Sequence, residues 1–330
     1  MTDTVTVVGA GIAGAACAVE LQRLGVTCRV LERGRAPGGR LASPSVHDRR
    51  VDLGAGYFTV RDEGFAVVVA QWERRGLARR WTDTFSLLTP HPRPGEPTSK
   101  SGPTRWAAPG GLRSLVRDLL TGVDVQLERE VSDLAELGGP GGPGGQGGQG
   151  GQGVPGGFPR GPVVLAMPDA QASLLAGDAV EGVSWLGSDP VIAVACGFAK
   201  RTWAATLGDA AFVNDDDDLT FVADDGSRRG DGAPVLVAHT TPALAARHLG
   251  APDGVVPVVG AALDRLLRTG APQWTHVHRW SLAKPGSAHD STHHWDGRLG
   301  LAGDQWCPDG PPRVESAWRS GVEVARAIAG

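Results

Sequence analysis

Short apolar runs alternate with amphipathic stretches near both ends of the chain, and this pattern predicts a fold of the α/β class. Valine, leucine and alanine concentrate in four runs that predict buried strands, at residues 4–8, 27–32, 163–168 and 299–302. Apolar side chains at helical spacing predict helices at 12–24 and 112–120, and a long helix that begins at Pro311-Pro312. Strands that alternate with helices favour a layered fold with one nucleotide-binding half.

The middle of the chain has a different pattern, which predicts a second domain. Strand-like runs recur between residues 188 and 240, at 191–198, 211–213, 219–223 and 235–239. They predict an antiparallel sheet, followed by helices at 242–249 and 254–268. In the segments between the two patterned regions we expect a helix at 62–80, a loop at 86–105 and paired strands at 123–131. Residues 138–157 contain 13 glycines in 20 positions, which predicts a flexible excursion on a hairpin loop.

A glycine motif lies at the junction of the first predicted strand and helix. Gly9-x-Gly11-x-x-Gly14 has the spacing and the strand-to-helix context of a dinucleotide-binding turn. We expect Gly9 to permit the tight turn, Gly11 to let the backbone approach a pyrophosphate, and Gly14 to let helix and strand pack closely. Glu32 ends the second predicted strand, where an acidic residue accepts hydrogen bonds from ribose hydroxyls. Together these residues predict a bound dinucleotide.

Three further motifs indicate that the dinucleotide is FAD. Gly38-Gly39-Arg40 follows Glu32 directly and suits close approach to phosphate, although an ordinary glycine turn with a surface arginine is the alternative. Asp52-Leu-Gly-Ala-Gly56-Tyr57-Phe58 suggests backbone beside a flat ring, or else a glycine-rich turn. Gly303-Asp304 ends the last strand and would bring an aspartate to the middle of the cofactor. Gly321, on the apolar face of the final helix, predicts a close helix crossing.

Composition and charge limit the kinds of molecule that this protein is expected to bind. The net charge of −4 and the pI of about 6.1 give no electrostatic case for nucleic acid or an anionic membrane surface. The four cysteines have neither disulfide-framework nor metal spacing, and we expect reduced thiols. With no membrane-spanning run and no signal peptide pattern, a cytoplasmic protein is expected. The acidic run 215–218 predicts a solvated hairpin turn, and His289, His293 and His294 are too irregularly spaced for metal binding.

These motifs, in this order, resemble the renalase-like branch of the FAD-dependent amine oxidase superfamily. The more specific parts of the resemblance are the segment at 54–58, His278-Arg279-Trp280, and Arg313-Val-Glu-Ser-Ala-Trp318. The resemblance implies a GR2-type Rossmann-like FAD-binding domain interleaved with a smaller α+β substrate domain built on an antiparallel sheet. The FAD-binding domain would comprise residues 1–55, 105–175 and 272–330, and the substrate domain residues 56–104 and 176–271.

The resemblance also implies an activity. Members of this branch oxidise aberrant dihydronicotinamide isomers, the 2- and 6-dihydro forms of NAD(P): a hydride passes to flavin N5, and dioxygen reoxidises the flavin to give hydrogen peroxide and NAD(P)+. The implied role is metabolite repair, with a dihydronicotinamide dinucleotide and O2 as the small-molecule partners. Carried over by position, the FAD contacts are Gly9, Gly11, Ala13, Gly14, Glu32, Arg33, Gly39, Arg40, Gly56, Tyr57, Val131, Gly303, Asp304 and Val314.

Two departures from the family pattern bear on the substrate. Gly56 stands where the family usually has glutamine, and Gly110-Gly111 where it often has Gly-Met. Hydride transfer to flavin needs no strong protein acid or base, which agrees with a sequence that shows no catalytic triad. His278 is the candidate on the substrate face, with a strand residue of purely structural role as the alternative. The alternative functions are an amine oxidase or desaturase for a small amine or secondary metabolite, and a non-catalytic FAD-binding protein.

Overall fold

The computed structural model describes residues 4–137 and 161–330, so the predicted glycine-rich excursion at 138–157 lies outside the described residues. The chain divides into two compact units, each assembled from separate stretches of sequence. The first unit combines Met1–Gly39, Val116–Gly187 and Pro285–Gly330, and the second combines Arg40–Leu115 and Ser188–Lys284. Helix α3 (Arg113–Leu119) spans the division in the sequence.

The first unit is built on a six-stranded sheet that brings both ends of the chain together. Its order is β14 (His294–Trp295), β15 (Leu299–Ala302), β8 (Val163–Ala166), β1 (Val5–Val8), β2 (Cys28–Leu31) and β7 (Val125–Gln126). All neighbours are parallel except β14 and β15. The four longer strands are almost entirely buried, as their valine and leucine content predicts for a sheet covered on both faces. The mixed α/β class expected from the sequence is thus confirmed.

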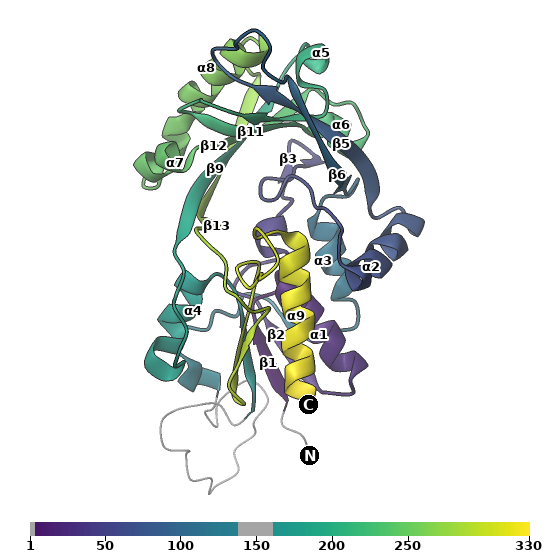
Figure 1. Cartoon of the computed structure of the whole chain (residues 1–330), viewed down its shortest axis with the longest axis vertical. Coiled ribbons are helices and arrows are strands. Elements are labelled where there is room, and N and C mark those ends of the chain that lie inside the picture. Colours follow the sequence, from purple (N-terminus) through teal and green to yellow (C-terminus); the bar gives the residue numbers. More distant parts are fainter. Residues whose placement is uncertain (1–3, 138–160) are drawn as a thin grey trace, which may run out of the picture. The chain divides into compact units, whose positions relative to one another are not determined.

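The helices of this unit are α1 (Ile12–Arg23), α4 (Asp169–Ala176) and α9 (Val314–Ala329). Helices α1 and α9 lie side by side (Figure 1). Gly321 of α9 is the reason they approach so closely, because a Cβ atom there would overlap the Ala13 carbonyl oxygen and lie 3.0 Å from the Cys17 nitrogen. The close crossing predicted from Gly321 is confirmed. An ion pair between Arg326 and Glu20 (2.8 Å) also joins the two helices.

The second unit is built on a seven-stranded sheet. Its order is β13 (Trp274–Pro285), β9 (Ser188–Gly197), β12 (Val235–Thr240), β11 (Leu219–Asp224), β10 (Ala210–Val213), β5 (Arg79–Leu88) and β6 (Ser99–Ala107). The pairings from β9 to β10 are antiparallel, as predicted, whereas β10 and β5 run parallel. Its other elements are α2 (Glu63–Arg74), α5 (Ala204–Leu207), α6 (Asp225–Arg229), α7 (Pro242–His248), α8 (Val256–Leu267) and the small hairpin of β3 (Ser45–Val46) and β4 (Arg49–Arg50).

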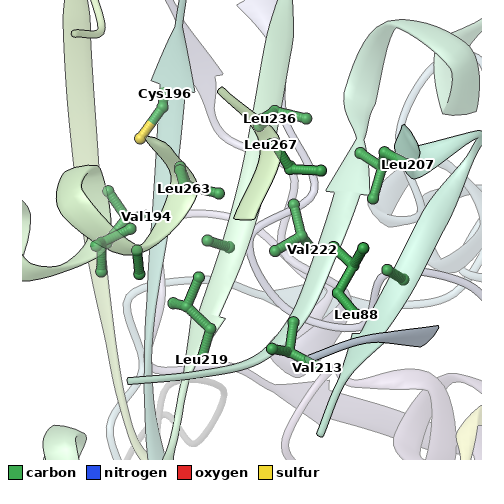
Figure 2. Close-up of a cluster of buried hydrophobic side chains, with 14 of the residues drawn as sticks. Leu88, Val194, Cys196, Leu207, Val213, Leu219, Val222, Leu236, Leu263 and Leu267 are labelled. Carbon is green, nitrogen blue, oxygen red and sulfur yellow. The ribbon is translucent and has the colours of Figure 1, made fainter. Parts of the chain in front are cut away.

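The two faces of this sheet carry different side chains. One face packs under α7 and α8 in an aliphatic core, where Leu263 and Leu267 of α8 lie beside Val194, Val222 and Leu236 of the strands (Figure 2). The other face is aromatic and includes Phe85, Phe212 and Phe221 with Tyr57 and Trp81 packed against them. Successive strand residues alternate between the two faces. We call the second set the aromatic face.

Three expectations about local structure were wrong. The segment 86–105, expected to be a loop, contains the end of β5 and most of β6, because pairing with a neighbour stabilises strands of low hydrophobicity. The helix expected at 62–80 ends at Arg74, since Gly76 takes a φ of +70° and reverses the chain. Of the strands expected at 123–131 only Val125–Gln126 forms, because Glu128 adopts a positive φ of 55°.

Candidate functional site

The turn between β1 and α1 is shaped by its three glycines. Gly9 has a φ of +108°, and a Cβ atom there would lie 2.6 Å from the Ala166 carbonyl oxygen of β8. A Cβ atom on Gly14 would overlap the Gly9 carbonyl oxygen, so α1 can pack on the turn only with glycine at this position. Gly11 is different, because no atom lies within 4 Å of the position of its missing Cβ. Gly9 and Gly14 therefore serve packing, and Gly11 leaves open space beside the backbone.

The N-terminal end of α1 is suited to an anion. Gly11 is the N-cap residue and no side chain caps the helix there. The first N–H groups of a helix have no partner within the helix, and its dipole favours negative charge at this end. Ala13 lies in this first turn and is buried. The open space at Gly11 and the uncapped N–H groups are suited to a pyrophosphate, and the binding of one there stays a prediction.

Glu32 lies at the end of β2 and is tied to the same turn. One carboxylate oxygen accepts a hydrogen bond from the Ala10 N–H (2.9 Å), and the other accepts one from the Gly34 N–H (2.7 Å). Each carboxylate oxygen has a further lone pair, so Glu32 can still accept from ribose hydroxyls. Gly38 donates to the Ala10 carbonyl oxygen (2.8 Å), and the missing Cβ of Gly39 would lie 3.4 Å from Gly11 Cα. The structure therefore brings the first two predicted motifs together, whereas Arg33 is exposed.

Replacing Glu32 by glutamine is expected to weaken FAD binding about tenfold, because the amide NH2 group cannot accept from either N–H and one donor loses its partner. Fluorescence titration of apoprotein with FAD measures the change. Glu130→Gln is the matched control, since Glu130 is an exposed glutamate of the same unit. Equal affinities of E32Q and the parent protein would contradict a cofactor role for this carboxylate.

The segment after β15 is held at the N-terminal end of α9. The Gly303 N–H donates to the buried Ser320 hydroxyl of α9 (3.1 Å). Ser316 donates to the Asp304 carbonyl oxygen (3.2 Å) and accepts from the Arg313 N–H (2.9 Å). Asp304 and the start of α9 therefore lie together, although eight residues separate Asp304 from Arg313 in the sequence. Val314 is the first residue of α9. Val131 is only partly buried and packs against the core beside β8 and β15.

A hydrogen-bonded cluster that the sequence did not predict lies next to Gly303. The Asp169 carboxylate, 2% exposed, binds His289 Nε2 (2.6 Å) and Gln305 Nε2 (2.8 Å). The His289 ring stacks on Trp306, with ring centroids 3.8 Å apart. His289 is thus engaged by a carboxylate and an indole. Within residues 4–137 and 161–330, no group of three or more His, Cys, Asp or Glu side chains is arranged to hold a metal ion.

In the second unit, Arg40 lies against the segment that contains Gly54. The Ala55 N–H donates to the Arg40 carbonyl oxygen (2.9 Å), and a Cβ atom on Gly54 would overlap that oxygen. The Arg40 guanidinium donates to the Ala283 carbonyl oxygen (3.3 Å) at the end of β13. The glycine at 54 therefore allows two backbone segments, both predicted to contact FAD, to run side by side.

A buried ionic network supports the same segment, and we call it the Arg228 network. Arg228 is fully buried and donates to the Gly56 carbonyl oxygen (3.1 Å), the Asp52 carbonyl oxygen (3.2 Å) and the Asp225 carboxylate (2.6 Å). Arg229 reaches the Asp52 carboxylate (3.0 Å), which also binds the Ser43 hydroxyl (2.5 Å). Burial alone would raise the pKa of Asp225, but Arg228 and Arg229 outweigh it and the pKa is lowered. The network fixes the backbone on both sides of Gly54.

Gly56 explains one departure from the family pattern. A Cβ atom there would lie 2.8 Å from the Phe221 ring, which fills the space that a glutamine side chain would need. Tyr57, the next residue, is half-buried and meets the Phe85 ring edge-on, with centroids 5.1 Å apart. The Arg105 guanidinium lies 3.9 Å from the Phe85 centroid and 5.7 Å from that of Tyr57. An aromatic ring thus replaces the missing amide.

His278 lies half-buried on β13, with its ring centroid 4.3 Å from that of Trp280. Burial is the main reason that its pKa is lowered, with His276 and Arg113 adding to the effect. Trp280 donates from its indole N–H to the Leu53 carbonyl oxygen (2.8 Å) and packs on a core cluster. Trp280 therefore has a structural role, while His278 remains a prediction for the substrate face.

A second histidine, missed in the sequence, lies on the aromatic face. The His239 ring of β12 has its centroid 5.5 Å from that of Phe221. Its Nε2 atom is buried and has no hydrogen-bond partner among the described residues. Burial lowers the pKa of His239 to about 3, and the positive charges of Lys284 and Arg228 act in the same direction. His239 is thus a neutral hydrogen-bonding group beside an aromatic ring. Its only sequence signal was a polar residue in an apolar strand.

Comparison with known proteins identifies the family. A family described as an NAD(P)-binding Rossmann-like domain matches residues 7–69, and one described as flavin containing amine oxidoreductase matches residues 85–329. The chain belongs to the flavin-containing amine oxidoreductase family. As a member of this family, the protein is an oxidoreductase with FAD as its cofactor. Within residues 4–137 and 161–330, no helix of this flavin oxidoreductase is both long and apolar enough to span a membrane.

Solved structures show the same fold for this flavin-containing amine oxidoreductase. Cyclohexylamine oxidase from Brevibacterium oxydans IH-35A has a TM-score of 0.73 at 15% identity, and a putative protoporphyrinogen oxidase from Exiguobacterium sp. 255-15 has 0.71 at 14%, each comparison covering 100% of this chain and 99% of the other. Wild-type putrescine oxidase bound to putrescine has a TM-score of 0.67 at 16% identity, covering 99% of both chains. The β1–α1 turn fits the FAD of such a protein, because Gly11 leaves room for phosphate and Glu32 is free to accept further hydrogen bonds.

Proposed function

We propose that this flavin oxidoreductase oxidises aberrant dihydronicotinamide isomers, the 2- and 6-dihydro forms of NAD(P), as a renalase-like metabolite-repair enzyme. His239 is the observation that supports the proposal best. It is an uncharged hydrogen-bonding group beside Phe221, on a face that also carries the rings of Phe85, Phe212 and Tyr57. A dihydronicotinamide is a flat, uncharged ring with a carboxamide, so stacking and one neutral hydrogen bond would recognise it.

The charge on this face argues against an amine as the preferred substrate. Protonated amines bind best over the faces of aromatic rings or beside carboxylates. Here the Arg105 guanidinium already lies 3.9 Å from the Phe85 centroid and close to Tyr57, where it would repel an ammonium ion. Putrescine oxidase and cyclohexylamine oxidase share the fold, so amine oxidation is the alternative that the test must include.

The reaction balances without a catalytic acid or base from the protein. The chemistry that bound FAD supplies is acceptance of two electrons from the substrate and their return to dioxygen. Overall, the dihydronicotinamide loses a hydride, and dioxygen gains that hydride and one solvent proton, which gives NAD(P)+ and hydrogen peroxide. The protein's part is to hold and orient both molecules.

The β1–α1 turn and Glu32 are the first residues that we propose to hold FAD. In the first unit, Gly11, Ala13 and the α1 N-terminus would take the pyrophosphate, and Glu32 would accept from ribose hydroxyls. We assign FAD binding to residues 1–55, 105–175 and 272–330, and substrate binding to residues 56–104 and 176–271. On the substrate side, His239 would orient the nicotinamide and His278 is the further candidate, while Gly56 and Tyr57 are proposed contacts of FAD.

Anaerobic mixing of the purified holoenzyme with candidate donors tests the proposal. The donors are 2-dihydroNAD(P), 6-dihydroNAD(P), ordinary NAD(P)H and a panel of amines including putrescine and cyclohexylamine, and the readout is bleaching of the flavin absorbance. We expect rapid bleaching by the 2- and 6-dihydro isomers alone. Bleaching by amines alone would establish the amine oxidase alternative. A flavin that no donor reduces would indicate a non-catalytic FAD-binding protein.

The half-buried His239, whose Nε2 atom is itself buried, should also make stability depend on pH. Its folded pKa of about 3 lies below the ordinary value of 6.5, so the unfolded chain binds the proton first as pH falls. Stability is therefore complete above pH 6.5 and is lost progressively as pH falls toward 3. When the pH is lowered from 7.5 to 5, the unfolding free energy of the parent protein should fall by about 1–2 kcal/mol more than that of the His239→Asn variant. Denaturant titrations at both pH values measure this, and parallel losses in the two proteins would contradict a neutral imidazole.

A further inference from the structure

A pocket in the second unit opens beside the aromatic face. Its volume is about 370 Å³, and the residues that line it come from β5, β6, β10, β11 and the turn after β10: Leu87, Lys100, Phe212, Val213, Asn214 and Thr220. Apart from Lys100, its lining is apolar or uncharged. One positive charge in such a pocket selects for a ligand group that is both compact and anionic.

The strand register places Lys100 on the same side of the sheet as the aromatic residues. Lys100 and Phe85 are directly opposite each other in the β5–β6 pair, so their side chains share a face. Phe212 belongs both to the pocket and to the aromatic face, with its ring centroid 5.4 Å from Phe85 and 6.1 Å from Phe221. Phe221 in turn neighbours His239 (5.5 Å). Two ring-to-ring steps thus lead from the proposed nicotinamide contact at His239 to the pocket.

Lys100 has its charge available for a ligand. It is exposed, and it has neither an ion pair nor a side-chain hydrogen bond among the described residues. Two of the carboxylates in the turn that follows Asn214 are already engaged, because Arg265 binds Asp216 (2.6 Å) and Asp218 (3.4 Å). The Thr220 hydroxyl is also engaged, donating to the carbonyl oxygens of His239 and Thr240 (3.5 and 3.4 Å). The Lys100 ammonium group is therefore the principal charged group of the protein in this pocket.

We propose that this pocket is a subsite for a phosphate group of a pyridine dinucleotide, with Lys100 as its counterion. The inference rests on the proposed function, since it assigns a place to the part of the substrate that does not react. The ribose separates the nicotinamide ring from the nearest phosphate, and the Phe221 and Phe212 rings separate His239 from the pocket in the same way. Lys100 is then a specificity residue: it distinguishes a dinucleotide from nicotinamide riboside, which has no phosphate, or from an amine.

Ligand binding to the oxidised holoenzyme tests the subsite without turnover. Calorimetric titrations would compare NADP+, NAD+, nicotinamide mononucleotide and nicotinamide riboside on the parent protein, Lys100→Met and Lys100→Arg. Loss of one charge-assisted contact should weaken binding of the phosphorylated ligands about tenfold in K100M, with riboside binding unchanged. K100R should retain most of the affinity. Because NADP+ carries a third phosphate that NAD+ lacks, a larger loss for NADP+ would place that phosphate, rather than the pyrophosphate, in the pocket.

Lys200→Met is the matched control, since Lys200 is an exposed lysine of the same unit that does not line the pocket. Three results would each overturn the subsite. K100M could lose as much affinity for the riboside as for the dinucleotides, K200M could lose as much affinity as K100M, or the parent protein could fail to bind the phosphorylated ligands. Flavin bleaching by 6-dihydroNAD, measured on the parent protein, K100M and K200M, tests the proposed function separately. If 6-dihydroNAD bleaches the flavin of K100M with the same KM as that of the parent protein, the subsite is rejected and the proposed function is retained.

Discussion

Alanine in place of Gly14 is expected to lower the affinity for FAD about 100-fold and to give a largely colourless protein. The new methyl group would overlap the Gly9 carbonyl oxygen and lie 3.2 Å from the Ala166 side chain, so α1 must move away from the turn that it packs on. Overpacking of this kind costs about 1–3 kcal/mol, and here the displaced elements are those that present the helix N-terminus to the cofactor. The ratio of flavin to protein absorbance, followed by titration of apoprotein with FAD, gives the loss.

Gly260→Ala is the matched control, because Gly260 is also a helical glycine, in α8, and no atom lies within 4 Å of its missing Cβ. Alanine there should leave flavin content unchanged and slightly raise the melting temperature, since alanine favours a helix more than glycine does. If G14A retained the flavin with the parent affinity, the close approach of α1 to the turn could not be what forms the anion site.

Replacing Arg228 by methionine is expected to lower the unfolding free energy by about 3–5 kcal/mol, because the buried carboxylate of Asp225 would keep Arg49 (2.6 Å) but lose its equally close, fully buried partner Arg228 (2.6 Å). The carbonyl oxygens of Asp52 and Gly56 would lose their donors as well. Denaturant unfolding of the apoprotein and of the holoenzyme measures the loss. In the folded fraction of R228M, the segment from Asp52 to Gly56 should become susceptible to limited proteolysis.

Arg247→Met serves as the control, since Arg247 is exposed in α7 of the same unit. A double variant separates charge from packing: Asp225→Asn combined with Arg228→Met removes one of the stranded carboxylates and should recover part of the stability. Should R228M be as stable as R247M, the Arg228 network would have no role in holding the backbone around Gly54.

The parts of this molecule that sequence predicted best are those whose physics is local. Gly9, Gly11 and Gly14 act within one turn, and Glu32 follows a strand that pairs with β1 directly, so motif and spacing were enough. Gly321 could also be predicted, because a glycine on the apolar face of a long helix has little other reason to be there. The antiparallel sheet of the second unit followed from its alternating apolar residues.

The features that sequence missed depend on partners far apart in the chain. Arg228 finds its acceptors at Asp52 and Gly56, and nothing near Arg228 in the sequence indicates that an arginine there is fully buried. Asp169 and His289 are likewise separated by most of the middle of the chain. Gly56 looked like a missing polar contact until the structure showed Phe221 in its place, and Phe221 could not be identified as the neighbour without the fold.

The packing of α9 on α1 has a consequence for protein synthesis. Strand β1 has β2 and β8 as neighbours, β8 needs β15, and α1 needs α9, whose Arg326 pairs with Glu20 at a separation of 306 residues. A nascent chain on the ribosome therefore exposes the apolar surface of α1 until α9 has been made. The second unit closes on strands from 79 to 284 and can form earlier. We accordingly expect the first unit to fold after the second, once α9 has emerged from the ribosomal exit tunnel.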